Sequence, residues 1–247
     1  MTFLPGYGVK VLANEVSVST LVSGVAMTHS RGVSEVTTGG QVIATAGASF
    51  VPGLMSGTMA LRGPQDSVGA TGLHAEIASA IGVHSALLLT ALPGGDALGA
   101  PALFAMGDPT DWGIDASVSD AVGFTMSAAA DESVEMGWVL HSLAAETADG
   151  NSASIDRGAA PSTPTTHGGA FGLHVTAFSG LTSAALKVQH SPDNSAWADL
   201  ASFVSVTAVG FQLVKLAPTV TVNRYLRCVT DVTGTGSVTF LMTAAPR

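Results

Sequence analysis

Short runs of β-branched and apolar residues recur along the last third of the chain and are separated by turn residues. The segment Pro-Asp-Asn-Ser at 192–195 gives one strong turn signal, and Gly234 and Gly236 mark another. The runs cover residues 171–178, 184–190, 198–204, 210–215, 225–230 and 237–243. Six short strands at a spacing of roughly 8–12 residues are typical of a β-sandwich. We therefore predict an Ig-like or jelly-roll β-sandwich over residues 171–247.

The first 143 residues also favour strands. Residues 9–12 and 16–22 are alternating or β-branched, and residues 13–15 fit a tight connection between them. Residues 31–53 hold five glycines among valines and threonines, which predicts a long hairpin with too few large apolar residues to form its own core. A returning strand is expected at 54–61. Further strands are expected at 86–92, 102–106, 117–130 and 134–143, so the chain is predicted to be mainly β.

One helix is expected, over residues 70–81. Leu73, Ile77 and Ile81 recur at four-residue spacing and so share one face of a helix. Gly82 stands where a C-terminal glycine belongs, and Thr71 or Asp66 is the candidate N-cap. We predict that this short helix covers one opening of a β-domain formed by residues 1–143. Residues 144–170 are rich in Pro, Ser, Thr, Gly and Ala without periodicity and predict a linker or an extended loop.

Charged residues are unusually scarce. They make up 11% of the chain, against roughly 25% in ordinary soluble domains. A lone soluble protein normally carries more charge on its surface, so much of this surface is expected to pack against further copies of the chain. A compositional bias from a GC-rich genome is the alternative reading. No run approaches the roughly 20 apolar residues that a membrane-spanning helix needs, and the first residues lack a signal-peptide pattern.

The charges are also unevenly placed. Residues 63–156 contain thirteen acidic residues and neither Lys nor Arg, while the formal net charge of the whole chain is −9. Such an uneven charge distribution bears on the electrostatic field of the protein and on its binding partners, but not on its fold.

A search for catalytic and metal sites finds none. The seven histidines have no ligand-like spacing, and no metalloprotease, nucleophile-elbow or phosphate-loop motif occurs. Cys228, the only cysteine, lies in an alternating run and is expected to be a small buried residue rather than a nucleophile. Asp108, Asp111, Asp115 and Asp120 lie close together in a segment that looks like a loop over 108–113, but their spacing matches no calcium motif and aromatics for a glycosidase cleft are few. We predict no enzyme, no cofactor and no metal. The basic residues do not cluster, which argues against direct nucleic-acid binding.

The N-terminal half resembles the major tail (tail tube) protein of tailed bacteriophages. The resemblance rests on the opening strand pair, the Gly-rich hairpin ending in Phe-Val-Pro-Gly-Leu at 50–54, the strand that follows, the short helix, and the segments 110–127 and 137–141. The segments 186–200 and 222–227 resemble a β-sandwich module that recurs in phage virion proteins. The resemblance implies stacked rings, expected to be hexameric, that form a tube for DNA ejection in the virion tail. It also implies synthesis in the host cytoplasm and contact with other tail proteins such as a tape-measure protein.

Two sets of residues are candidates for roles in such a tube. An acidic channel would repel the phosphates of passing DNA and let it slide without sequence-specific binding; the candidates for facing the lumen are Asp115, Asp120, Asp131 and Glu132. A solvated acidic exterior is the alternative. The hairpin is expected to become ordered on neighbouring rings, and its candidate contact residues are Val36, Val42, Ile43 and Phe50.

A second function class stays open. The chain could be a virion decoration or host-adhesion protein whose C-terminal sandwich binds carbohydrate. Its candidate aromatic platforms are Trp197, Phe203, Phe211 and Tyr225, most of which we expect to find in the core.

Overall fold

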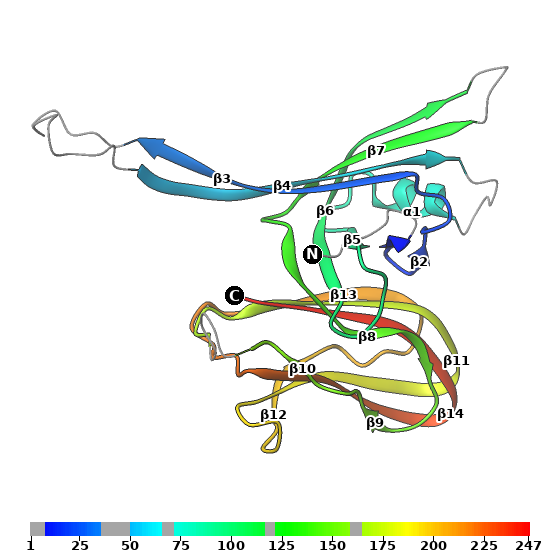
Figure 1. Cartoon of the computed structure of the whole chain (residues 1–247). Helices are drawn as coiled ribbons and strands as arrows, with labels where there is room; N and C mark the ends of the chain where they lie inside the picture. The colour runs from blue at the N-terminus through cyan, green and yellow to red at the C-terminus, as the bar shows by residue number, and fades with distance from the viewer. Residues whose placement is uncertain (1–7, 36–49, 66–71, 117–121, 159–164) are drawn as a thin grey trace, which may run out of the picture.

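The computed structural model describes residues 8–35, 50–65, 72–116, 122–158 and 165–247, and it is mainly β (Figure 1). Its elements are β1 (Lys10–Ala13), β2 (Val16–Ser17), β3 (Gly24–Glu35), β4 (Phe50–Pro64), α1 (Leu73–Ala80), β5 (Leu87–Leu92), β6 (Pro101–Asp115), β7 (Gly123–Ala130), β8 (Glu135–Glu146), β9 (Gly150–Asn151), β10 (Ile155–Asp156), β11 (Gly169–Ser191), β12 (Ala198–Ser202), β13 (Gly210–Leu216) and β14 (Tyr225–Pro246). The mainly-β prediction is confirmed.

The strands form one continuous, branched sheet. Its main path runs β12-β11-β14-β8-β6-β5-β1-β2, and the branch β7-β4-β3 leaves from β6. Every pairing in it is antiparallel among the described residues. β6 and β8 therefore carry the sheet from the N-terminal half of the chain into the C-terminal half.

The N-terminal half has its core between the branch and α1. Met59 and Leu61 of β4 and Phe124 and Met126 of β7 point to one face of the branch and are buried. Apolar side chains at alternate positions of a strand bury only one face of a sheet, and α1 covers that face here.

The helix is shorter than predicted. Leu73 and Ile77 are buried as expected, but Ile81 is 58% exposed, since it has an extended backbone and lies past the helix end. Gly82 has a φ of 77°, which agrees with the glycine stop signal. Gly72 is the N-cap and makes no side-chain cap bond.

The C-terminal half differs from the prediction in strand length. The structure has four strands where six were predicted, because β11 and β14 each span two predicted strands. β11 and β14 pair with each other along nearly their whole lengths. Both strands bend from one layer of the sandwich to the other (Figure 1). Register shifts around Gly180 and Gly234, whose φ values are positive, allow this bend. The curved pair encloses a core that includes Phe171, Leu186 and Phe240.

Segment 108–113, predicted as a loop, is strand. It belongs to β6 and pairs with β7 despite Pro109, because a bulge between Pro109 and Asp111 interrupts the ladder there. Two short strands lie in the segment 144–170: β9 and β10 both pair with β14.

A buried polar contact joins the two halves. Nδ1 of His174 in β11 lies 2.5 Å from the backbone oxygen of Asn14, and Nε2 lies 2.7 Å from the Thr90 hydroxyl. All three residues are buried, and the apolar residues Leu12, Leu92, Ala102, Val139 and Leu241 pack together at the same junction. The N- and C-terminal halves therefore share packing as well as a sheet.

Candidate functional site

The branch of the sheet has two unpaired edges. Its four strands are β3, β4, β7 and residues 107–115 of β6, which we call the four-stranded sheet. Among the described residues β3 pairs with β4 alone, and β6 beyond Gly107 pairs with β7 alone. Unpaired N–H and C=O groups on a long edge are a template for pairing with another chain.

The face of this sheet turned away from α1, which we call the open face, carries small side chains. Thr28 and Thr58 are cross-strand partners whose hydroxyl oxygens lie 2.5 Å apart, and those of Ser30 and Ser56 lie 2.8 Å apart. The strand registers place on this face Ala26, Thr28, Ser30, Ser56, Thr58, Ala60, Arg62, Asp108, Asp111, Gly113, Asp115, Thr125, Ser127 and Ala129. None of these paired positions carries a large apolar side chain that would drive the face into a core.

The carboxylates of the open face lie at one edge. Asp111 and Asp115 are exposed on β6, so the structure places the sequence candidate Asp115 on the open face together with Asp111, which was not chosen for the lumen. Arg62 is the basic residue of this face and its side chain covers Gly24. Asp120 lies outside the described residues.

The other two acidic candidates lie in the turn between β7 and β8. Asp131 accepts a hydrogen bond from the Ser85 hydroxyl, and Glu132 lies 3.1 Å from Lys215 of β13. These contacts hold the turn against Ser85 and against β13 of the same chain.

The predicted hairpin is present as β3 and β4, which project beyond the rest of the molecule (Figure 1). Phe50 starts β4 opposite Glu35. Val36, Val42 and Ile43 lie outside the described residues. Leu54 and Met55 of β4, which the sequence reasoning did not select, are 92% and 42% exposed.

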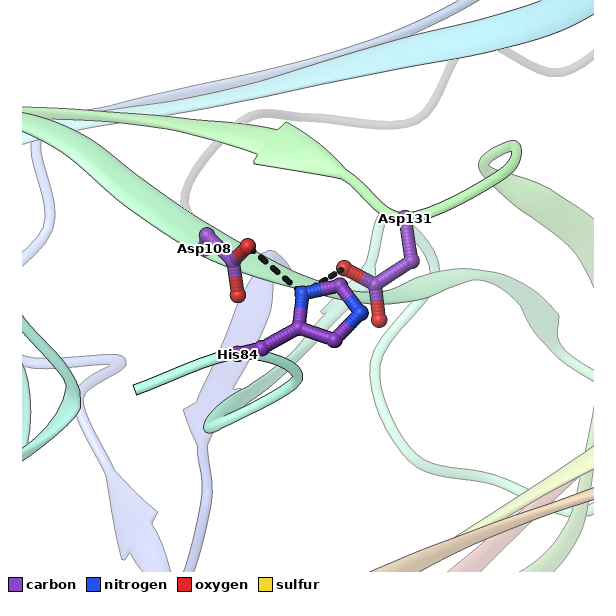
Figure 2. Close-up of side chains that lie close together, drawn as sticks. All are labelled: His84, Asp108 and Asp131. Carbon is purple, nitrogen blue, oxygen red and sulfur yellow. Dashed lines mark hydrogen bonds and ion pairs between the residues drawn. The ribbon is translucent and has the colours of Figure 1, made fainter. Parts of the chain in front are cut away.

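A histidine and two aspartates come together where β5, β6 and the β7–β8 turn meet (Figure 2). Nδ1 of His84 lies 2.9 Å from Oδ2 of Asp108 and 3.9 Å from Oδ1 of Asp131. The Ser85 backbone N–H donates to Asp108 Oδ1 at 2.7 Å, and its hydroxyl donates to Asp131 Oδ2 at 2.5 Å. We call these three side chains the His84 cluster.

Charge and hydrogen bonding act together in the His84 cluster. The hydrogen bond and the charge of Asp108, followed by the charge of Asp131, raise the pKa of His84. The bonds from His84 and from the Ser85 backbone lower the pKa of Asp108. The sequence analysis grouped Asp108 with its neighbours in sequence, whereas the fold groups it with residues 24 and 23 positions away.

Cys228 is buried, as predicted. It is 1% exposed, and burial raises the pKa of its thiol to about 12. A thiol in this state is inert as a nucleophile at neutral pH. No helix among the described residues is long and apolar enough to cross a membrane.

Comparison with known proteins finds no matching family model and no matching curated protein. Among solved structures, a chain of the virion of a native gene transfer agent particle matches 53% of this chain and 97% of its own length, at 9% identity and a TM-score of 0.41. The sheath/tube terminator of an extracellular contractile injection system matches 55% of this chain and 97% of its own, at 19% identity and 0.43.

A third structure matches nearly the whole chain. The Dit protein of phage SPP1, described as a hub of the adsorption apparatus, covers 96% of this chain and 98% of its own, at 8% identity and a TM-score of 0.34. Scores and identities this low assign neither a family nor an activity.

Proposed function

We propose that this chain is a structural subunit of a phage tail or a related particle, and that it assembles head to tail into stacked rings that form a tube. The observation that carries the proposal is the four-stranded sheet with two unpaired edges and an open face of small side chains. Proteins normally cover, shorten or charge long unpaired sheet edges to prevent pairing with another chain.

The strand directions allow copies of the chain to continue one sheet. The four strands alternate in direction, so the two edge strands, β3 and β6, run in opposite directions. A second copy can therefore place its β3 beside β6 and continue the same antiparallel pairing. A head-to-tail interface of this kind closes into a ring when the rotation between copies allows it, and closure into a barrel leaves no free edge.

In such a ring the open face would line the channel. Its hydroxyl and methyl groups offer DNA few strong contacts, and Asp111 and Asp115 would repel phosphates. A ring of six copies, stacking through the projecting β3–β4 hairpin, contact with a tape-measure protein, and residence in the virion tail are parts of the same proposal. We further propose that the chain is not an enzyme.

Negative charge on β3 is expected to weaken assembly. Neighbouring copies would place β3 beside the acidic β6, whereas within one copy these strands lie at opposite edges of the sheet. The double variant Thr28→Asp/Ser30→Asp should lose about 1 kcal/mol per interface from like charges on paired strands, which is a roughly fivefold rise in the concentration needed for assembly. Sedimentation and negative-stain electron microscopy would measure this.

The matched control is Thr28→Asn/Ser30→Asn, which has similar side-chain size and no charge. It should assemble like the unmodified chain, and circular dichroism should find both variants folded, because exposed substitutions change stability by about 0.5 kcal/mol or less each. The proposal fails if the unmodified chain stays monomeric at high concentration, or if the Asp variant assembles as readily as the Asn variant.

The adhesion alternative has one observation in its favour. Of the four candidate aromatics Phe203 is buried, but Trp197, Phe211 and Tyr225 are only partly buried, contrary to the expectation that most would be core. The Arg227 guanidinium lies 4.2 Å from the centre of the Trp197 ring, and it donates to Gln189, which donates to Asp199. A ring beside ordered polar groups suits a sugar, so selective binding on a glycan array that Trp197→Ala abolishes would support this alternative.

A further inference from the structure

We propose that the His84 cluster is a binding site for a first-row divalent transition-metal ion of the zinc type, a role independent of the tube proposal. Each member offers one ligand atom, and these atoms all lie within 4.8 Å of one another. Nδ1 of His84 is the atom nearest to Oδ2 of Asp108 and to Oδ1 of Asp131. Zinc binds nitrogen and carboxylate oxygen at about 2.0–2.2 Å, so ligand atoms on one ion lie roughly 3–3.5 Å apart. The separations of 2.9 and 3.9 Å fall on either side of that spacing.

Ser85 holds both carboxylates in the orientation that the ion requires. It donates to Oδ1 of Asp108 and to Oδ2 of Asp131, and in each case the other carboxylate oxygen is the one that faces the imidazole (Figure 2). Outer hydrogen bonds that fix the ligand groups in this way are a regular feature of protein metal sites. One residue outside the three ligands therefore orients two of them.

The charge of the cluster matches a divalent cation. Two carboxylates face one imidazole, and within the described residues neither Asp108 nor Asp131 forms an ion pair with Lys or Arg. An imidazole nitrogen among the ligands favours zinc, nickel or copper over calcium and magnesium, because the last two prefer sites made only of oxygen atoms. Three protein ligands leave at least one position for water, or for a group from a neighbouring molecule.

The position of the site gives the ion a structural effect. The cluster links the segment before β5, the middle of β6 and the turn after β7, and β6 becomes an unpaired edge just beyond Gly107. A bound ion would fix these three segments to one another. We therefore expect zinc to raise the thermal stability of the folded chain, because an ion that binds the native state stabilises it.

Calorimetric titration of tag-free, full-length protein with zinc chloride tests the proposal. One ion per chain should bind, and His84→Ala, Asp108→Asn and Asp131→Asn should each lower the affinity at least about tenfold. The Asn variants keep the side-chain shape and an oxygen that can accept from Ser85. Ser85→Ala keeps the backbone donor and loses the hydroxyl, so it should lower the affinity by about tenfold through the orientation of Asp131.

The controls are Asp111→Asn, an exposed aspartate of the same strand, and His29→Ala, an exposed histidine of β3. Both should bind zinc as the unmodified chain does, and cobalt should give a visible absorption band that disappears in His84→Ala. The proposal is overturned if zinc does not bind, if it binds equally well to His84→Ala, or if calcium binds this site more tightly than zinc. The first two results would leave the cluster as a salt bridge with no zinc ion, and the third would make it a calcium site instead.

Discussion

His174 is expected to lower the free energy of unfolding by about 3 kcal/mol as the pH falls from 6.5 to 4, because its side chain must stay neutral in the folded chain. Burial lowers the pKa of His174 from 6.5 to about 4. Above pH 6.5 the side chain is neutral in both the folded and the unfolded state, so protonation of His174 removes nothing from the free energy of unfolding. Between 6.5 and 4 the unfolded chain binds a proton that the native chain does not, so stability is lost at about 1.4 kcal/mol per pH unit. Below pH 4 the loss from this group is complete.

The hydrogen bonds of His174 explain why the neutral form is fixed. Nδ1 faces a backbone carbonyl oxygen, that of Asn14, and so must carry the proton. Nε2 therefore accepts a hydrogen bond from the Thr90 hydroxyl. A second proton on Nε2 would place a charge in the junction between the two halves and would oppose the Thr90 donor. Acid is thus expected to weaken the junction before it affects the exposed strands.

His174→Gln isolates this effect, since glutamine offers a donor and an acceptor but does not titrate. Urea unfolding at pH 7.5, 5.5 and 4 should show that the free energy of unfolding decreases with pH in the unmodified chain. In His174→Gln the decrease from pH 7.5 to pH 4 should be smaller by about 3 kcal/mol. His190, whose pKa burial also lowers, is only partly buried, and His190→Gln should keep most of the fall. Equal pH profiles for the unmodified chain and His174→Gln would contradict the prediction.

Glu76 acts in the opposite direction. Burial raises its pKa, and it accepts a hydrogen bond from the Asn14 side chain at 3.1 Å. Its native form therefore keeps a proton to higher pH than the unfolded form, which adds stability as the pH falls through its raised pKa. The comparison between the unmodified chain and His174→Gln cancels this contribution because Glu76 is present in both.

Local sequence pattern was sufficient for most of the strands and for the helix. Alternation and glycine signals gave β1, the β3–β4 hairpin and the core face of α1, because these features depend on neighbours within a few residues. The loop prediction for 108–113 was wrong because Pro109 and the aspartates look like turn residues. A bulge and a solvent-facing edge let β6 tolerate them, and both depend on pairing with β7.

Contacts between distant segments could not be predicted from the sequence pattern. His174 and Asn14 are 160 positions apart, so nothing in the pattern around either residue indicates the junction. The His84 cluster likewise needs β5, β6 and the β7–β8 turn to meet. The acidic residues of segment 63–156 look alike in sequence, yet the fold sends Asp115 to the open face and Asp131 to the turn.

Gly137 marks the place where the sheet passes from one half to the other. It pairs with Ala102 of β6, and the next residue, Trp138, pairs with Ala244 of β14. A Cβ atom on Gly137 would lie 2.0 Å from the backbone oxygen of Ala244 and 2.7 Å from its carbonyl carbon. These are main-chain atoms of a strand paired on both sides, so they cannot move aside as a flexible side chain would.

Gly137→Ala is therefore expected to lower the free energy of unfolding by about 3 kcal/mol or more, the upper range for overpacking a core. For a chain of this size, that corresponds to a fall in Tm of roughly 6–12 °C. Gly150→Ala in β9 is the matched control, because a Cβ there meets no atom within 4 Å, and it should change stability by about 0.5 kcal/mol or less. Thermal unfolding followed by circular dichroism would compare the two. If Gly137→Ala unfolds at the same temperature as Gly150→Ala, β8 and β14 do not approach as closely as the structure has them, and the shared sheet between the halves is looser than the backbone distances require.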